Sequence, residues 1–487
     1  MSKLLRIAIA TAVTSVAIFA APITGSSTAP LPKLTGPIPV TADSYPLLAA
    51  NRNLQPIDLQ KVGYVEEEFI VSGTANVYDW AADGSLTVKT PDAPYATRIL
   101  IRRPQDPSRF SGQAVVELLN PARRFDWGMM SGYLRDSLIE RGDAWVGITM
   151  PASAKALQKF NPTRYAALSF ANPNPSEACA AGRGGAAPAT SDQEDGLRWD
   201  MISQVGVALK SKTGLNASSL YMTAQGADVQ TYLAAIQRHA KLASGKPVYD
   251  GFLIKTPGGV GAIRRCAPAV GRDDPRQKIE NAGVPVMLVV AQGEISEAYQ
   301  RPDSDDPGDR FRIYEVAGAA HIDKWAYRDL PGFPDQLAAI GTPGQGTPDW
   351  PFNVRCEPEI LLQEHPLLKY ILDGAVMNLE LWTTKGTAPP KADRITLLAS
   401  SKSDVVAVSG GVRNPYVDVP AATYTTTTAG PGTCRELGRT IPYDWAQLEA
   451  LYGSQKNYAA KVAESVDKMV KEHWITTSDA RKIKAGQ

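Results

Sequence analysis

Apolar residues occur along much of the chain in short runs that alternate with stretches of helical periodicity. The runs Gln113–Leu119, Ala144–Thr149 and Val284–Ala291 are almost continuously apolar, which is typical of strands buried on both faces of a parallel sheet. Four more strands are predicted, at Tyr64–Val71, Ala96–Arg102, Tyr249–Thr256 and Phe311–Val316. Helices are predicted between strands, for example at Asp126–Arg141 and Asp195–Leu209. This alternation predicts an α/β fold with a mostly parallel, doubly wound sheet.

The stretch Ser219–Ala235 combines a strand, an abrupt turn and a helix. Its strand is predicted at Leu220–Met222, and the apolar residues of its helix recur at helical spacing at Val229, Tyr232, Leu233 and Ile236. α/β-Hydrolases carry their nucleophile on such a strand–turn–helix element, within the sequence G-x-S-x-G. That sequence does not occur here, and Thr223 stands where the serine is expected. We therefore predict Thr223 as the nucleophile.

Two further residues complete a catalytic triad in the chain order of α/β-hydrolases. Glu294 follows the strand Val284–Ala291 and is predicted as the acid, with Glu297 as a weaker alternative. His321 follows the last strand and is predicted as the base. Backbone amides of Ala224 and of Ala122 or Arg123 are the predicted oxyanion hole. No metal site and no cofactor are predicted.

Charge and cysteine content narrow the class of protein. Lys and Arg number 51 and Asp and Glu number 50 in 487 residues, without a basic run, so we expect no nucleic-acid partner. None of the four cysteines lies in a C-x-x-C sequence, and in an exported chain they predict two disulfides in any of three pairings.

The N-terminus predicts export. Lys3 and Arg6 precede an apolar run, Ile7–Ala21, that is too short to span a bilayer comfortably. Residues 1–25 are therefore predicted as a secretory signal peptide, with a periplasmic or extracellular mature protein and no stable membrane insertion after its removal.

The remaining chain divides into three predicted parts. Residues 26–60 are an N-terminal extension, and residues 61–345 are the α/β core with an insertion at about 155–195, rich in proline, glycine and alanine near its end. Residues 346–487 are a C-terminal extension packed on the core. Its predicted elements are helices at Leu367–Trp382 and Asp444–Lys471 and β-like pieces at Ser403–Val408 and Val417–Val419.

Several longer segments make a family resemblance specific, namely VVELLNPARRFDW, EDGLRWDMISQVG, YEVAGAAHID, LDGAVMNLELW, GGVRNPYVDVPAATY and IPYDWAQLEALYGS. With them the chain resembles the bacterial exported alpha/beta hydrolase domain family over nearly all of its mature length. The resemblance implies the α/β-hydrolase fold with helices on both faces of the sheet. It aligns the family's G-x-S-Q-S-G with Tyr221–Gly226, its acid with Glu294 and its histidine with His321. It also implies that Cys356 pairs with Cys434, which leaves Cys179 with Cys266.

Together these features predict an exported hydrolase of carboxylic esters, small-molecule or polymeric, that acts through the Thr223 hydroxyl. Threonine is β-branched, and the strained turn of a nucleophile disfavours such residues. One alternative is therefore a catalytically impaired relative that binds a small molecule or polymer in the inherited pocket. Another is chemistry without a serine-type nucleophile, such as hydrolysis by water that His321 and Glu294 activate. A carboxylate nucleophile at Asp228 is a further alternative.

Overall fold

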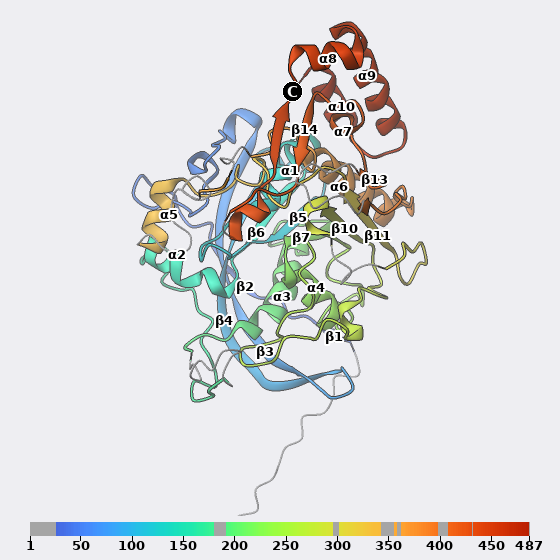
Figure 1. Ribbon diagram of the computed structural model, residues 1–487. Helices are drawn as coiled ribbons and strands as arrows, with labels where there is room; N and C mark the ends of the chain where they lie inside the picture. The colour runs from blue at the N-terminus through green and yellow to red at the C-terminus, as the bar shows by residue number, and fades with distance from the viewer. Residues whose placement is uncertain are drawn as a thin grey trace, which may run out of the picture.

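A computed structural model describes residues 26–179, 191–295, 301–341, 355–357, 362–397, 408–430 and 432–486. Its centre is a sheet of nine strands in the order β11-β10-β9-β7-β5-β6-β4-β3-β2 (Figure 1). The strands from β11 to β6 run parallel, and β4, β3 and β2 are antiparallel. The bounds are β2 (Lys33–Thr35), β3 (Tyr64–Trp80), β4 (Leu86–Pro104), β5 (Gln113–Leu118), β6 (Ala144–Ile148), β7 (Ser219–Gln225), β9 (Gly251–Lys255), β10 (Val286–Ala291) and β11 (Phe311–Val316).

Helices cover both faces of this sheet. The helices are α1 (Met129–Arg141), α2 (Ala154–Phe160), α3 (Arg198–Lys210), α4 (Ala227–Ala235), α5 (Phe333–Ile340), α6 (Lys369–Lys385), α7 (Pro415–Asp418), α8 (Trp445–Tyr452), α9 (Gln455–Lys471) and α10 (Thr477–Lys484). Side chains of α1 and α6 share one buried apolar cluster, and those of α3 and α4 share another. The predicted doubly wound α/β fold is thereby confirmed.

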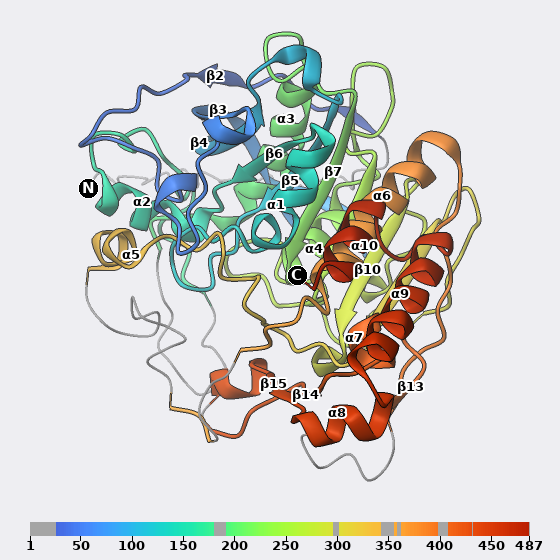
Figure 2. The ribbon, with the colours of Figure 1, turned by 90° about the horizontal axis from the view of Figure 1, so that it is seen from above.

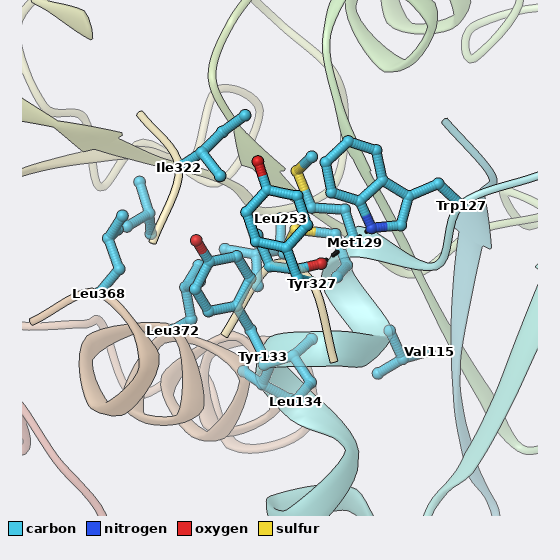
Figure 3. Close-up of a cluster of buried hydrophobic side chains, with 14 of the residues drawn as sticks. Val115, Trp127, Met129, Tyr133, Leu134, Leu253, Ile322, Tyr327, Leu368 and Leu372 are labelled. Atoms are coloured by element: carbon cyan, nitrogen blue, oxygen red, sulfur yellow. Dashed lines mark hydrogen bonds between the residues drawn. The ribbon is translucent and has the colours of Figure 1, made fainter. Parts of the chain in front are cut away.

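Alternation along the strands explains why there are two clusters. Val115, Tyr221 and Leu253 point into the α1/α6 cluster, whereas the neighbouring residues Val116, Met222 and Ile254 point into the α3/α4 cluster. Figure 3 shows the first cluster, where Tyr133 and Leu134 of α1 lie near Leu372 of α6. Both faces are buried, which is why the central strands are apolar at consecutive positions.

The segments outside the predicted core also contribute elements. Residues 26–60 supply β2 at the edge of the sheet and β1 (Ser27–Thr28), which pairs with β8 (Ala240–Lys241). After residue 346, α6 packs on α1, β9 and β10, and α9 packs against both α8 and α10 (Figures 1 and 2). Two small antiparallel pairs are β12 (Thr396–Leu397) with β13 (Val408–Ser409) and β14 (Ala422–Thr425) with β15 (Arg439–Pro442).

Three local predictions were wrong for identifiable reasons. The predicted helix Asp444–Lys471 is two helices, because Gly453 has a left-handed φ of 71° and the Ser454 side chain caps α9. Val417–Val419 is not β-like, since Asn414 caps α7 and Pro415 begins it. The first two predicted strands are much longer, because β3 and β4 pair with each other along nearly their whole length. The β-like piece at Ser403–Val408 lies outside the described residues except at its end.

Both disulfides have the pairing that the family resemblance implies. Cys179 is bonded to Cys266 with an S–S distance of 2.04 Å, and Cys356 to Cys434 with 1.96 Å. The second bond ties residue 356 to the segment between β14 and β15. Among the described helices, none is both long and apolar enough to cross a bilayer.

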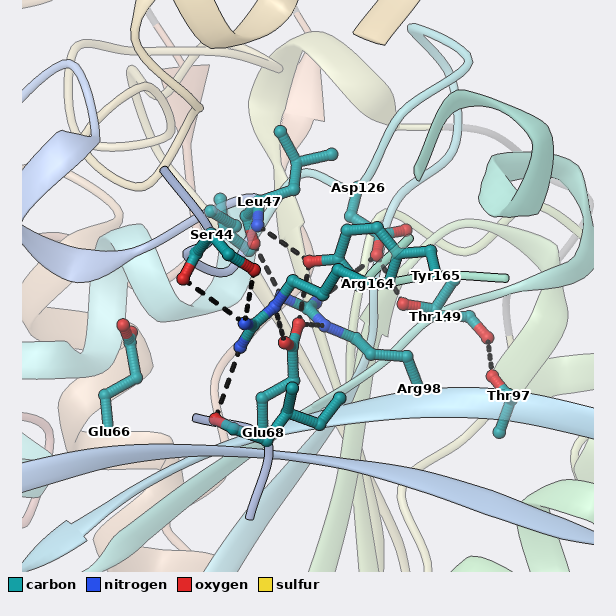
Figure 4. A network of polar contacts seen from close by, with 12 residues as sticks. Ser44, Leu47, Glu66, Glu68, Thr97, Arg98, Asp126, Thr149, Arg164 and Tyr165 are labelled. Carbon is teal, nitrogen blue, oxygen red and sulfur yellow. Dashed lines mark hydrogen bonds and ion pairs between the residues drawn. The ribbon is translucent and has the colours of Figure 1, made fainter. Parts of the chain in front are cut away.

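A buried ion network fastens the N-terminal segment to the core (Figure 4). Glu68 on β3 accepts from Arg98 Nε at 2.6 Å and from Arg164 Nε at 2.5 Å, and all three side chains are fully buried. Arg98 also donates to the carbonyl of Leu47. Removing one member of such a network leaves charges without compensation in the interior.

We expect Glu68→Gln to lower the free energy of unfolding by roughly 3–5 kcal/mol, because two buried guanidinium groups lose their shared carboxylate. Its control is Glu67→Gln, which breaks the partly exposed pair with Arg103 (2.7 Å) on the adjacent position of the same strand. That change should cost about 1 kcal/mol or less. Urea unfolding monitored by circular dichroism measures both free energies of unfolding. Equal decreases in the two variants would contradict a special role of the buried Glu68 network in stability.

Candidate functional site

The turn between β7 and α4 is sharp, and a glycine makes it. Gly226 has φ 108° and ψ −164°, a backbone conformation that is essentially restricted to glycine. A second glycine allows the close approach of the next loop, since a Cβ at Gly258 would lie 2.7 Å from the Ala227 amide nitrogen. The strand therefore continues through Gln225, and helix α4 begins directly after Gly226.

Thr223 is not at this turn, which corrects the prediction that it is the nucleophile. Its side chain is fully buried within β7, and its Oγ1 donates to the carbonyl of Leu253 on β9 at 2.8 Å. The prediction failed because the strand runs further than the apolar run Leu220–Met222 indicated. A hydroxyl committed inside the sheet is not positioned to attack a substrate.

Gln225, which sequence analysis did not single out, takes the place beside the histidine. Its Nε2 lies 2.9 Å from Nε2 of His321. Gln225 follows Thr223 by two positions, so both side chains project from the same face of the strand. The signal that could have located it is Gly226, the one glycine of the segment Ser219–Ala235.

His321 and Glu294 come together from two adjacent strands. Glu294 follows β10 and His321 follows β11, and the carboxyl ends of these parallel neighbours lie at one edge of the sheet. His321 Nδ1 lies 2.6 Å from Glu294 Oε1. The side chains form the chain Glu294–His321–Gln225, with the imidazole 20% exposed and the carboxylate 4%.

Lys255, at the end of β9, is a member of the site that sequence analysis missed. Its fully buried ammonium donates to Glu294 Oε1 at 3.0 Å and to the carbonyl of His321 at 2.8 Å. Two more donors, Thr256 Oγ1 at 2.6 Å and the Ala291 amide at 2.9 Å, complete the shell of the carboxylate. The lysine was hidden because it ends an apolar run that reads as an ordinary strand.

These contacts fix the charge of Glu294. Burial by itself would raise its pKa, but the Lys255 ammonium and the His321 ring outweigh burial and lower the pKa to about 2. An ionised carboxylate accepts the proton on Nδ1 of a neutral imidazole, which assigns the tautomer. Nε2 then keeps its lone pair, to which the Gln225 amide donates.

Asp323 and Tyr133 are buried close to Glu294 and Lys255. Burial raises the pKa of Asp323 to about 6, and its carboxylate accepts from the amides of Trp325 and Ala326. The Lys255 ammonium lies 5.9 Å from the centre of the Tyr133 ring. The carboxyl group of Asp323 is therefore a titratable group buried near the Lys255–Glu294 ion pair.

Two of the three amides predicted for the oxyanion hole lie in positions that the fold defines. The Ala122 amide donates to Asn120 Oδ1 at 2.8 Å, and Ala224 lies inside the ladder of β7 with β9. The Gly226 amide donates to the Thr256 carbonyl at 3.1 Å. Burial lowers the pKa of Arg123, which lies near Tyr327 and Glu436.

Two alternative carboxylates were predicted, Asp228 as a nucleophile and Glu297 as the acid. Asp228 lies in the first turn of α4 and pairs with Arg198 at 3.3 Å. Glu297 lies outside the described residues. Among the residues that the structure does describe, no cluster of three or more His, Cys, Asp or Glu side chains could hold a metal ion.

Comparisons with known proteins identify the family. The profile of a family described as "Alpha/beta hydrolase domain" matches residues 34–485. Among curated proteins, no sequence is significantly similar to the chain.

Solved structures show distant likeness. A Rhizomucor miehei esterase structure is 11% identical with a TM-score of 0.32, over 68% of this chain and 92% of the other. A thermostable esterase from Pseudomonas putida is 10% identical with a TM-score of 0.32, over 62% and 86%.

Replacing Lys255 tests whether its ammonium lowers the pKa of Glu294. The depressed pKa of Glu294 contributes stability that is present above the carboxyl group's unfolded pKa, about 4.3, and is lost as pH falls toward the folded value. We expect Lys255→Met to raise the pKa of Glu294, so that this contribution disappears at a higher pH. Carboxyl ¹³C NMR titration measures the shift.

The matched control is Lys210→Met, which breaks the pair (2.7 Å) between Lys210 at the end of α3 and Asp250 just before β9. It should leave the titration of Glu294 unchanged. An unaltered Glu294 pKa in Lys255→Met would show that the ammonium does not set the charge of the acid.

Proposed function

Because the chain belongs to the alpha/beta hydrolase domain family, we propose that it hydrolyses a carboxylic ester with a water molecule that His321 activates directly. The observation that carries this proposal is the chain Glu294–His321–Gln225, in which an ionised carboxylate holds the imidazole and leaves Nε2 facing the turn. Neither residue of the turn, Gln225 or Gly226, carries a hydroxyl group, a thiol or a carboxylate. These residues support a general base, His321, but the turn offers no side-chain nucleophile.

In the proposed reaction the substrate carbonyl enters between His321 and Gln225 and parts their hydrogen bond. His321 Nε2 takes a proton from water while the water oxygen bonds to the carbonyl carbon. The tetrahedral intermediate collapses, its bond to the alcohol oxygen breaks, and His321 returns the proton to that oxygen. The products are a carboxylic acid and an alcohol, and Glu294 stabilises the imidazolium that forms in between.

Gln225 is the proposed donor to the developing oxyanion. Its amide already lies within hydrogen-bond distance of the base, so a carbonyl placed there meets an N–H group. Side-chain amides serve this role in other hydrolytic sites, where removal of one such donor costs about 10²–10³ in kcat. Its Oε1 is buried without a hydrogen-bond partner among the described residues, so reorientation of the amide breaks only the hydrogen bond to His321.

A second candidate is a protein that binds an ester or acid and does not turn it over. The observation that favours it is the bond of Gln225 to His321 Nε2, which occupies the lone pair of the base. The Gly226 amide, the backbone donor nearest to Gln225 along the chain, is likewise engaged with Thr256.

We further propose that the protein works after export. Its two disulfides fit an oxidising compartment, where such bonds persist. In this proposal residues 1–25 are removed as a signal peptide, residues 61–345 form the core, and residues 346–487 extend it. The substrate class is a small-molecule or polymeric ester.

Three variants separate the roles within the site, assayed on p-nitrophenyl acetate. His321→Ala should lower kcat by about 10²–10⁴, because it removes the general base. Gln225→Ala should lower it by about 10²–10³ through loss of the oxyanion donor. Thr223→Val should keep wild-type kcat, at a cost of about 1 kcal/mol in the free energy of unfolding for its lost hydrogen bond.

Loss of activity in Thr223→Val, with an intact fold by circular dichroism, would return the covalent role to Thr223. Equal rates for wild type and His321→Ala would instead favour the binding-only candidate.

A further inference from the structure

A cavity of about 550 Å³ lies between the core and the C-terminal helices α9 and α10. Gln225, Glu294 and His321 are not among the residues that line it. Its volume is in the range of small-molecule sites, which are mostly apolar with a few polar groups. The apolar wall includes Trp325, Pro415, Tyr416, Tyr458, Val462 and Ile483.

His365 lines this cavity and is held in place by two tyrosines. Its ring stacks on Tyr416 with centroids 4.9 Å apart, and its Nδ1 lies 2.5 Å from the hydroxyl of Tyr424. An unprotonated imidazole nitrogen is a stronger hydrogen-bond acceptor than a phenol oxygen, so we assign the Tyr424 hydroxyl as the donor to Nδ1. The proton of the neutral imidazole is then on Nε2, which has no protein partner within the described part of the chain.

The charge state of His365 agrees with that assignment. Burial, together with the Lys324 ammonium, lowers the pKa of His365, and the exposed Glu364 opposes this only in part. The ring is therefore neutral at pH 7, with one nitrogen accepting and the other donating.

Lys324 adds a positive charge to the same lining. Its ammonium lies 5.3 Å from the centre of the Trp325 ring, and no described carboxylate is within ion-pair distance of it. Lys484, the other lysine of the cavity, is paired with Asp467 at 2.5 Å. The cavity thus joins an aromatic and aliphatic wall to the His365 ring, the Lys324 ammonium and the carboxylate of Glu364, which also lines it.

We propose that this cavity binds a small carboxylate with an aromatic or aliphatic body. The body packs against Trp325 and Tyr458, and the carboxylate accepts from His365 Nε2 and faces Lys324. Nothing in this inference depends on the proposed reaction at His321.

The test measures binding of 4-phenylbutyrate to the full-length mature protein by isothermal titration calorimetry at pH 7. Its uncharged analogue, 4-phenylbutan-1-ol, should bind about tenfold more weakly or worse, since a hydrogen bond to a charged group is lost. His365→Phe keeps the ring against Tyr416 but removes the N–H group, and should weaken 4-phenylbutyrate by about tenfold.

Filling the cavity gives a second, independent variant. Ala459 lines the cavity on the exposed side of α9, so Ala459→Trp can block it without overpacking the core, and binding should be lost. Lys461→Gln, on the same helix but outside the cavity, should bind as wild type does. His321→Ala should also bind normally.

No saturable binding of 4-phenylbutyrate by the wild type would overturn the proposal. So would binding that survives both Ala459→Trp and His365→Phe, or binding that His321→Ala abolishes, because the ligand would then occupy another site. The reaction proposed at His321 is tested by the separate ester assay, so either proposal can fail without the other.

Discussion

The interaction on which this site depends is the buried ion pair of Glu294 with Lys255. A carboxylate at 4% exposure is costly unless it is paired and hydrogen-bonded, and here an ammonium, a hydroxyl, a backbone amide and an imidazole surround it. These donors come from the ends of β9, β10 and β11, so the register of three parallel strands is held to one geometry. The orientation and tautomer of His321 follow from that geometry.

The sequence predicted those parts of the molecule that burial determines. The central strand β10 is apolar throughout because helices cover both faces of the sheet. The bounds of β10 and of the edge strand β11, which carries Arg312 and Glu315, were both predicted within two residues. Glu294 and His321 could be recognised because each is a polar residue just past the end of such a strand. The cysteine pairing required the family resemblance, since four cysteines by themselves allow three pairings.

What the sequence could not give is the exact place where β7 ends. Thr223 and Gln225 are separated by two positions and project from the same face, so a small error in the strand boundary exchanged one for the other. The family alignment reinforced Thr223, because it matched the serine position without regard to where the turn lies. The role of Lys255 could not be predicted for a different reason. Its partners, Glu294 and His321, are distant in the sequence and come close to it only when the strand ends meet in the fold.

Intact-protein mass spectrometry after rapid acid quench tests the central claim, that water rather than a side chain attacks the ester. The protein is mixed with excess p-nitrophenyl acetate and quenched during turnover that depends on His321. Attack by water should give a single species at the unmodified mass. An acetyl adduct that accumulates during turnover and maps to the peptide containing Thr223 would contradict it.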